Sequence, residues 1–362
     1  MRFTTAIVAA ILQLAAAIAN PTNVEKRASC TLTSFSDLAS VKSSCTTITV
    51  GNLAVPAGQT LDFSGLISGT KIIFTGTVTF GYVEWEGPLV TVGGSKITIT
   101  GSPGHLFNGN GASWWDGLGG NGGKIKPKFF AARLTDSTVT GLNIKNTPRN
   151  CFSVNKCTNL TIDSVIFDNR DGDVTNGGHN TDAFNVGSST GITINNATVY
   201  NQDDCLAVNS GENIVFSNNY CSGGHGVSIG SVGGRTDNIV KNVTISDTSI
   251  VNSDNGVRIK TVYNATGSVS DITYSGITLL NIAKYGIVIQ QDYENGSPTG
   301  TPTAGVPITG LTLKSVKGTV ASSGTNIYIL CASCSNFSWS GVSVTGGKKS
   351  TKCQGVPSGV SC

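Results

Sequence analysis

Short apolar alternations recur along the chain from about residue 95 onward. One set mixes alternate apolar residues with Asn, Thr and Ser, and its clearest members are Leu160-Thr161-Ile162, Ile192-Thr193-Ile194, Ile272-Thr273-Tyr274, Leu311-Thr312-Leu313 and Phe337-Ser338-Trp339. A second, sharper set consists of Phe152-Ser153-Val154, Phe184-Asn185-Val186, Leu206-Ala207-Val208, Val227-Ser228-Ile229, Val257-Arg258-Ile259, Ile287-Val288-Ile289 and Ile327-Tyr328-Ile329. Alternation of this kind predicts β-strands, and its recurrence every twenty to forty residues or so predicts a repeat architecture.

The pattern favours an all-β fold, a single-domain right-handed parallel β-helix. Each repeat is too small to bury its own apolar face, so the repeats are expected to stack into one solenoid. A β-sandwich also combines alternation with Gly-rich turns, but regular repetition favours the solenoid. The single helix that the sequence predicts, at residues 34–44, carries Phe35, Leu38 and Val41 on one face and is expected to cap the first rung.

The N-terminal segment is expected to be removed during secretion. Residues 1–19 have the features of a signal peptide, because Arg2 precedes the apolar run Ala6–Ala19, which ends in small residues. Residues 20–27 end in the dibasic pair Lys26-Arg27 and are expected to be a pro-segment. Residues 28–362 then form the β-helix domain of a secreted, extracellular protein.

Hydropathy and charge exclude two classes of partner. The apolar run is shorter than the roughly 20 residues that cross a bilayer, so no membrane span is expected. The formal net charge is only +3, which gives no basic field for nucleic acid. Charged residues make up 12% of the chain, against roughly 25% in an average protein, so any cluster of charge is informative.

Ten cysteines follow the predicted processing site, and an even number in a secreted chain favours disulfide bonds. Sequence leaves the connectivity open, but local spacing suggests Cys30 with Cys45, Cys151 with Cys157, Cys205 with Cys221, Cys331 with Cys334, and Cys353 with Cys362. Six motifs for N-glycosylation occur, at Asn159, Asn196, Asn242, Asn264, Asn295 and Asn336.

Ionisable residues align when the strands of the second set are stacked. Asp182, Asp204 and His225 each lie two positions before the first apolar residue of three consecutive strands, and Asp203 adjoins them. Adjacent strands are about 4.8 Å apart, so these residues are expected to be neighbours at one edge of a sheet. An isolated Asp-Asp pair is usually part of a turn, but the shared alignment favours a functional site.

Arg258 and Lys260 flank the inward-facing Ile259 and are expected to point outward into the same groove. Clustered carboxylates raise the pKa of one member, so that an acid and a base coexist, which is what glycoside hydrolysis requires. The two cations indicate an anionic substrate, for which a uronic acid polymer is the natural choice. Calcium binding by the carboxylates is the alternative, and the cations would oppose it.

Four segments resemble the signature segments of the polygalacturonases, glycoside hydrolase family 28. They are Asn180-Thr181-Asp182, Gln202-Asp203-Asp204, Gly224-His225-Gly226 and Arg258-Ile259-Lys260. The likeness extends over essentially the whole mature chain, and residues 222–235 are similar to the fungal endo-acting members. The resemblance implies a parallel β-helix that hydrolyses α-1,4-D-galacturonosyl bonds of polygalacturonate, or de-esterified pectin, with inversion and without a metal or other cofactor.

The resemblance also implies a role for each residue. Asp203 is expected to be the general acid, supported by His225, while Asp182 and Asp204 hold and deprotonate the attacking water. Substrate contacts are expected from Asn180, Arg258, Lys260 and Tyr293.

Two features complicate the resemblance. A single rung, about 4.8 Å, between Asp182 and Asp204 is closer to the roughly 5 Å of retaining enzymes than to the wider inverting gap. The suggested pair Cys151 and Cys157 exceeds the four bridges typical of fungal members.

Two other functions compete with hydrolysis. A pectin or pectate lyase would use an Arg or Lys base, often with calcium, and the three Asp residues argue against it. A non-catalytic carbohydrate-binding solenoid would need an aromatic platform, whereas aromatic residues are only 7% of the chain. The compact chain favours endo over exo attack, and the resemblance implies a monomer with the pectin polymer, and a plant inhibitor protein, as partners.

Overall fold

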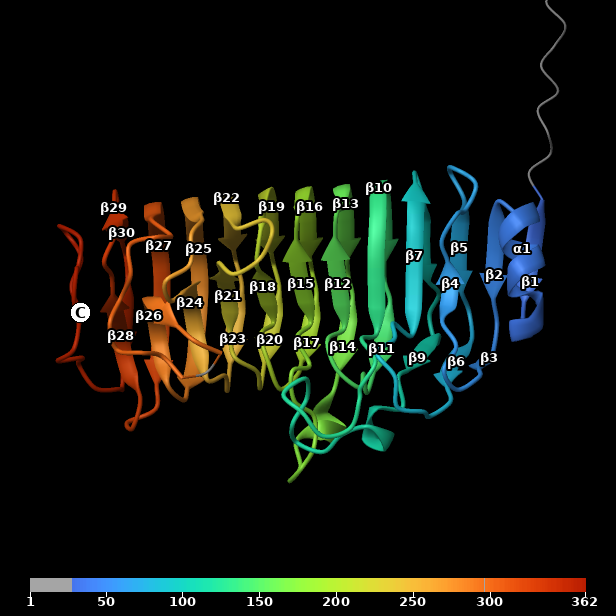
Figure 1. Cartoon of the computed structure of the whole chain (residues 1–362), viewed down its shortest axis with the longest axis horizontal. Helices are drawn as coiled ribbons and strands as arrows, with labels where there is room; N and C mark the ends of the chain where they lie inside the picture. The colour runs from blue at the N-terminus through green and yellow to red at the C-terminus, as the bar shows by residue number, and fades with distance from the viewer. Residues whose placement is uncertain (1–27, 296) are drawn as a thin grey trace, which may run out of the picture.

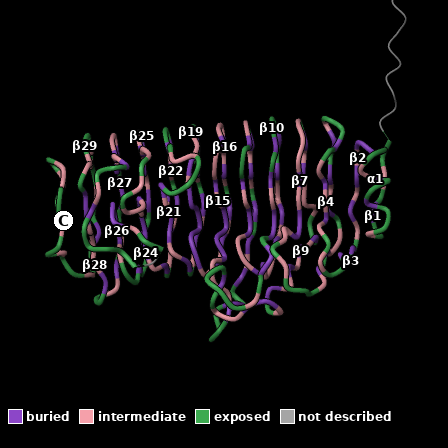
Figure 2. The backbone as a smooth tube through the Cα atoms, viewed as in Figure 1, coloured by how far each residue is buried: buried purple, intermediate pink, exposed green. Residues whose placement is uncertain are grey.

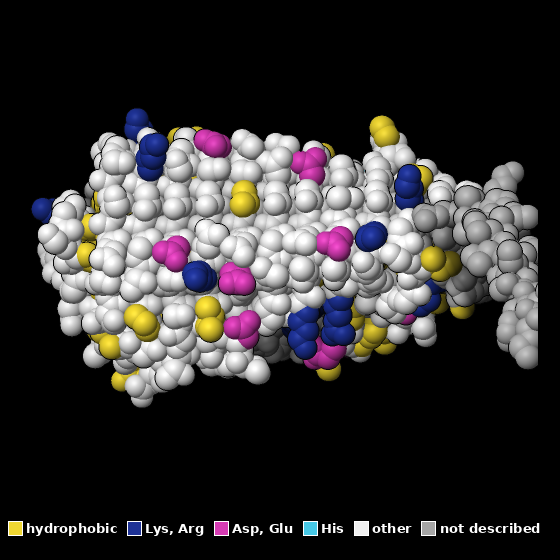
Figure 3. Space-filling view, turned by 90° about the horizontal axis from the view of Figure 1, so that it is seen from above, with side chains coloured by type: hydrophobic (Ala, Val, Ile, Leu, Met, Phe, Trp, Pro, Cys, Tyr) yellow, Lys and Arg dark blue, Asp and Glu magenta, His cyan; other side chains and the backbone are white. Residues whose placement is uncertain are grey.

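The computed structural model describes residues 28–362 except residue 296, so the signal peptide and pro-segment predicted over residues 1–27 lie outside the described residues. The described chain winds through successive rungs into one elongated solenoid, with its first strands at one end and its C-terminus at the other (Figure 1). Buried residues alternate along the strands with residues that are mostly of intermediate exposure (Figure 2). Charged side chains are sparse on the face shown in Figure 3.

The strands pair in parallel from rung to rung and form three columns, which we call columns A, B and C. Column A contains β1 (Ser29–Leu32), β2 (Thr47–Val50), β5 (Lys71–Phe74), β8 (Thr98–Gly101), β13 (Thr158–Asp163), β16 (Ser189–Asn195), β19 (Gly211–Ser217), β22 (Ile239–Ser246), β29 (Cys334–Ser335) and β30 (Ser338–Ser340). Column B contains β3 (Leu53–Val55), β6 (Thr77–Phe80), β9 (Leu106–Asn108), β11 (Asn143–Lys145), β14 (Ile166–Asp168), β17 (Thr198–Tyr200), β20 (Tyr220–Ser222), β23 (Ser249–Val251) and β31 (Ser343–Thr345).

Column C contains β4 (Leu61–Phe63), β7 (Val90–Ser95), β12 (Phe152–Asn155), β15 (Phe184–Gly187), β18 (Leu206–Val208), β21 (Val227–Val232), β24 (Asn255–Val262), β26 (Tyr285–Tyr293) and β28 (Thr325–Leu330). Three long strands bend between columns: β10 (Phe130–Thr140) from C to A, and β25 (Ser268–Ile282) and β27 (Ile308–Val320) from A to B. These parallel pairings confirm the β-helix and exclude the β-sandwich, in which strands pair mainly antiparallel.

The register of column C confirms the second set of alternations. The first apolar residue of each predicted strand is paired with the next along the column, in the order Phe152, Phe184, Leu206, Val227, Val257, Ile287 and Ile327. Column B was not predicted, because most of its strands are only three residues long and too short to show a period.

A left-handed residue makes the corner between columns A and B on six consecutive rungs, from β13–β14 to β27. The corner positions have positive φ angles of 48° to 69° and are occupied by Ser164, Asn196, Asn218, Asp247, Gly276 and Ser315. Gly, Asn and Asp tolerate this conformation better than most residues, because their side chains are absent or short and polar. The corner therefore accounts for part of the chain's unusual content of small polar residues.

The predicted N-terminal helix is present but shorter than expected. A 3₁₀ turn, η1 (Phe35–Asp37), precedes helix α1 (Leu38–Ser44), so α-helical geometry begins at Leu38 rather than at residue 34. Leu38 and Val41 are buried and Phe35 packs against the core, which confirms the capping role.

Four of the five suggested cysteine pairs are bonded: Cys30 with Cys45, Cys205 with Cys221, Cys331 with Cys334, and Cys353 with Cys362. The fifth suggestion was wrong, since Cys151 and Cys157 are free and buried. They flank strand β12, whose residues rise about 3.3 Å each, so the two Cα atoms lie beyond the roughly 7 Å that a disulfide spans.

We expect the denatured, unreduced protein to expose two reactive thiols per chain, and the folded protein to expose none, because burial raises the pKa of both the Cys151 and Cys157 thiols. Thiol titration with and without denaturant measures both values. A denatured chain without reactive thiols would show that the fifth bridge forms after all.

Candidate active site

A groove of about 1160 Å³ runs along the outer face of column C. Its walls contain all eight residues that the sequence analysis selected for the site: Asn180, Asp182, Asp203, Asp204, His225, Arg258, Lys260 and Tyr293. The structure therefore brings together residues that lie more than a hundred positions apart in the sequence.

The backbone of column C places the three acidic residues on adjacent rungs. Asp182 immediately precedes the rung of β15, and the pair Asp203 and Asp204 precedes β18. The N–H of Ala183 donates to the carbonyl oxygen of Asp204 at 3.0 Å, which fixes the two rungs in register. Cys205 follows this pair and is bonded to Cys221, so a disulfide braces the end of the acidic segment.

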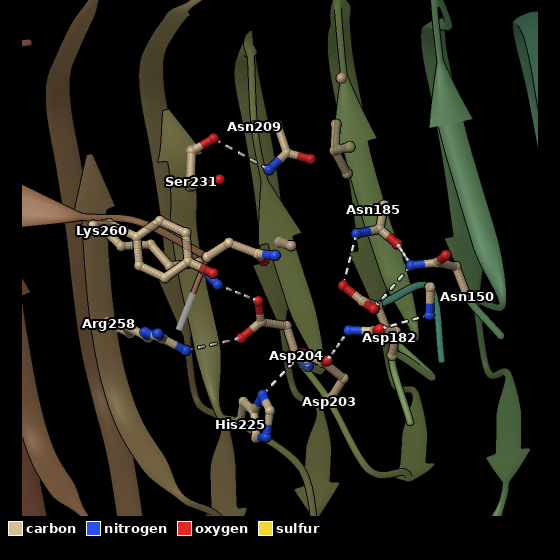
Figure 4. A pocket seen from close by; sticks show the side chains of 18 of the residues that line it. Asn150, Asp182, Asn185, Asp203, Asp204, Asn209, His225, Ser231, Arg258 and Lys260 are labelled. Atoms are coloured by element: carbon tan, nitrogen blue, oxygen red, sulfur yellow. Dashed lines mark hydrogen bonds and ion pairs between the residues drawn. The ribbon is translucent and has the colours of Figure 1, made fainter. Parts of the chain in front are cut away.

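Asp182 is held by two amides. Asn150 Nδ2 donates to Asp182 Oδ1 at 2.8 Å, and Asn185 Nδ2 donates to Oδ2 at 2.9 Å (Figure 4). Burial, together with the charges of Asp203 and Asp204, raises the pKa of Asp182 to about 8. This carboxyl therefore keeps a proton at mildly acidic pH.

Asp203 forms an ion pair with His225. The distance from His225 Nδ1 to Asp203 Oδ1 is 3.0 Å, Asn180 Nδ2 donates to Asp203 Oδ2 at 2.9 Å, and the N–H of Asp204 donates to Oδ1 at 2.7 Å. Burial alone would raise the pKa of Asp203, but the hydrogen bond and charge of His225 outweigh it and lower the pKa below 3.8.

His225 has a raised pKa. Burial alone would lower it, but the hydrogen bond to Asp203 and the charges of Asp203, Asp204 and Asp254 raise the pKa above 6.5. The distance from His225 Nε2 to Asp254 Oδ2 is 3.6 Å. The imidazolium thus lies between two carboxylates and carries a proton beside Asp203.

Both oxygens of Asp204 are occupied. Lys260 Nζ donates to Oδ2 at 2.7 Å, and Ser228 Oγ donates to Oδ1 at 2.7 Å. Arg258 Nη1 lies 3.9 Å from Oδ1, and Figure 4 shows the two cations on the opposite side of Asp204 from Asp182. Lys260 and Ser228 thus supply the hydrogen bonds that a buried carboxylate requires.

Arg258 retains hydrogen-bonding capacity for a ligand. Its Nε is buried without a partner, and its nearest carboxylate, on Asp204, is at the long distance of 3.9 Å. The ring of Tyr293 lies beside both cations, with its centroid 5.7 Å from the Arg258 guanidinium carbon and 5.2 Å from Lys260 Nζ. A carboxylate entering here would satisfy the guanidinium.

Asp203, Asp204 and His225 also have ligand atoms within 4.8 Å of one another, as a metal site requires. Their oxygens, however, are already paired with His225 and with Lys260. A cation would have to displace both positive groups, so the charges around this cluster favour an anionic substrate over calcium.

Several residues of the site were missed from the sequence. Asn150 and Asn185 bind Asp182, Ser228 binds Asp204, and Asp254 faces His225. Asn185 and Ser228 occupy the same outward position of column C as Arg258, through the pairings of β15, β18, β21 and β24. That alignment could have identified these two, whereas Asn150 and Asp254 lie in turns without a repeating signal.

Comparison with known proteins identifies the family. The family model described as "Glycosyl hydrolases family 28" matches residues 45–362. The chain is 64% identical over 345 residues to Endopolygalacturonase 1 of Colletotrichum lindemuthianum, covering 95% of each chain, and 60% identical over 347 residues to the polygalacturonase of Cochliobolus carbonum, also covering 95% of each. This chain belongs to glycosyl hydrolase family 28.

The solved structures agree with the family 28 fold. Endopolygalacturonase I from Stereum purpureum, determined in complex with two galacturonates, superposes with a TM-score of 0.80 at 37% identity, over 88% of this chain and 95% of that one. Within the described part of this family 28 chain, none of the helices has the length and apolar character needed to cross a bilayer.

We expect the turnover number to fall as the pH rises through the raised pKa of His225, because the Asp203 and His225 pair then loses the proton that it shares. In His225→Asn the only proton left to the pair is that of the Asp203 carboxyl, so the alkaline limb should no longer follow the raised pKa of His225. A pH profile of kcat for both proteins checks this. An alkaline limb that stays in place would remove His225 from the proton pathway.

Proposed function

We propose that this chain is a secreted, endo-acting polygalacturonase that hydrolyses α-1,4-D-galacturonosyl bonds of polygalacturonate. The observation that carries the proposal is the single groove in which three carboxylates and an imidazole face two cations. The printed names of the relatives support the substrate, and the free hydrogen-bonding capacity of Arg258 supports an acidic sugar.

Substrate binding starts at the cations. A galacturonate carboxylate is proposed to pair with Arg258 and Lys260 beside the bond that is cleaved, with Tyr293 packing against the sugar and Asn180 shaping the opposite side of the site. The ammonium of Lys260 would then interact with both the carboxylate of Asp204 and the carboxylate of the substrate.

Asp203 is proposed to be the general acid. The pair shares one proton, which rests on His225 because the imidazolium lowers the pKa of Asp203, and the pair distance of 3.0 Å allows this proton to pass through Asp203 to the leaving oxygen.

Water is proposed to lie between Asp182 and Asp204. Both oxygens of Asp204 are held by Lys260 and Ser228, which fixes the carboxylate beside the position proposed for the water. Direct displacement by water inverts the anomeric carbon, so we propose an inverting reaction although the two carboxylates lie one rung apart.

The extent of the groove supports endo attack. Its lining reaches from Ser153 on β12 to Tyr328 on β28, so rungs are available on both sides of the acidic cluster. A polymer can therefore lie across the site with sugars bound on each side of the cleaved bond.

The setting of the enzyme is also proposed. The four disulfides are typical of an extracellular protein. The proposed enzyme is a monomer, and its proposed partners are the pectin polymer and a plant inhibitor protein. The six glycosylation motifs all have their Asn at exposed positions with positive φ.

We expect Asp203→Asn to fold and to bind polygalacturonate while its kcat falls about 10²- to 10⁴-fold, because the substitution removes the proton donor and leaves the shape unchanged. Reducing-end release measures kcat. Asp37→Asn is the matched control, because it removes an exposed carboxylate near the N-terminal end, outside the groove, without creating a glycosylation motif. Normal turnover by a folded Asp203→Asn protein would contradict the assignment.

A further inference from the structure

A loop at the side of the groove is built around a buried lysine. The loop spans residues 114–127, between η2 (Gly111–Ser113) and β10, and two indole N–H groups anchor its start: Trp114 Nε1 donates to the carbonyl oxygen of Val83 at 2.9 Å and Trp115 Nε1 to that of Thr147 at 3.1 Å. Lys126 lies near its end and is only 2% exposed. Lys126 does not line the groove itself.

The ammonium of Lys126 is fully satisfied by its own loop. Its Nζ donates to Asp116 Oδ2 at 2.8 Å, to the carbonyl oxygen of Lys124 at 2.7 Å and to that of Gly122 at 3.3 Å. Asp116 in turn accepts from the backbone N–H groups of Leu118 and Lys124, at 2.9 and 2.8 Å. A buried charge is tolerated only with such partners, so the pair fixes the loop conformation from within.

The loop holds the segment that carries Asn180 at three points. The N–H of Gly117 donates to the carbonyl oxygen of Gly177 at 3.0 Å, and Asn121 Nδ2 lies 3.3 Å from His179 Nε2. The third contact is the N–H of Gly120, which donates to Asn180 Oδ1 at 2.9 Å. Because the amide oxygen is fixed, the amide nitrogen of Asn180 is left to donate to Asp203 Oδ2.

Gly119 allows the loop to lie close to Asn180. Its φ angle is +58°, a conformation that favours glycine, and a Cβ at this position would collide with Asn180 Oδ1 and with the carbonyl oxygen of His179. A continuous chain of contacts thus runs from Lys126 through the loop and Asn180 to the carboxyl of Asp203.

We infer that Lys126 is a positioning residue for the reaction: its buried ion pair holds the loop so that Gly120 fixes the Asn180 amide, and that amide orients Asp203 toward the scissile bond. This inference rests on the proposed role of Asp203 as the acid. It adds a contact chain that begins outside the groove and includes none of the other charged groups of the site.

Two variants interrupt the chain at different points. Lys126→Met removes the ammonium, and Gly119→Ala leaves the ion pair in place but pushes the loop away from Asn180. We expect kcat to fall about ten- to hundredfold in each, with KM changed by less than about twofold, because a small displacement of a reacting group costs rate more than binding. Thermal melting confirms that each variant is folded at the assay temperature.

Lys42→Met is the matched control. It breaks a similar ion pair, with Lys42 Nζ 2.9 Å from Asp62 Oδ2, near the N-terminal end and outside the groove. Its kcat should equal that of the unmodified protein. Asn180→Ala should lose as much rate as Lys126→Met, and the double variant should lose no more than Asn180→Ala alone, since both changes act through one contact.

A second readout does not depend on turnover. The chain has only three His residues, so NMR can follow the titration of the His225 ring. Asp203, Asp204 and Asp254 act on this ring, and Lys284 lies 2.8 Å from Asp254. When Asp203 loses the Asn180 hydrogen bond, more of its charge acts on His225, so the pKa of His225 should rise in Lys126→Met, Gly119→Ala and Asn180→Ala, but not in Lys42→Met.

The outcomes separate the two claims. If the unmodified protein does not cleave polygalacturonate, the proposed function fails, while the NMR titration still tests the contact chain. Folded Lys126→Met and Gly119→Ala proteins with unchanged kcat and an unchanged His225 pKa would overturn the inference. Loss of rate that adds to that of Asn180→Ala in the double variant would also overturn it, because the lysine would then act by another route.

Discussion

The parallel register of column C is the constraint on which the site depends. Strands β15, β18, β21 and β24 pair residue for residue, so Asp182, Asp204 and His225 occupy adjacent rungs although loops of different length separate them in sequence. A slip of one residue would turn each outward side chain into the core. The buried aliphatic and aromatic residues of column C therefore maintain the geometry of the charged groups that stand outside it.

The electrostatics follow from that geometry. Each acidic residue of the site has a different partner: amides for Asp182, His225 for Asp203, and Lys260 for Asp204. The different partners separate the pKa values of neighbouring carboxyls, which lets acid and base coexist. Arg258 Nε has no hydrogen-bond partner among the described residues, which leaves the guanidinium capacity to pair with an anion.

The sequence predicts the features that recur from one rung to the next. Column C, the acidic alignment and the two outward cations all follow from alternation and stacking, and the family resemblance added the roles. Features without a period could not be predicted. The three-residue strands of column B gave no signal, and the Lys126 loop depends on contacts between side chains and backbone groups that no alternation encodes. The pair Cys151 and Cys157 was suggested from spacing alone, although the alternation already predicted a strand at residues 152–154 between them.

The protein is proposed to hydrolyse a uronic acid polymer at bonds inside the polymer rather than at its ends. The most direct measurement incubates the protein with polygalacturonate and a calcium chelator and follows reducing ends, viscosity and ultraviolet absorbance together. We predict new reducing ends with a rapid loss of viscosity and no absorbance from unsaturated products. Absorbance that grows with cleavage would show elimination instead of hydrolysis, and the absence of any cleavage would contradict the assigned substrate.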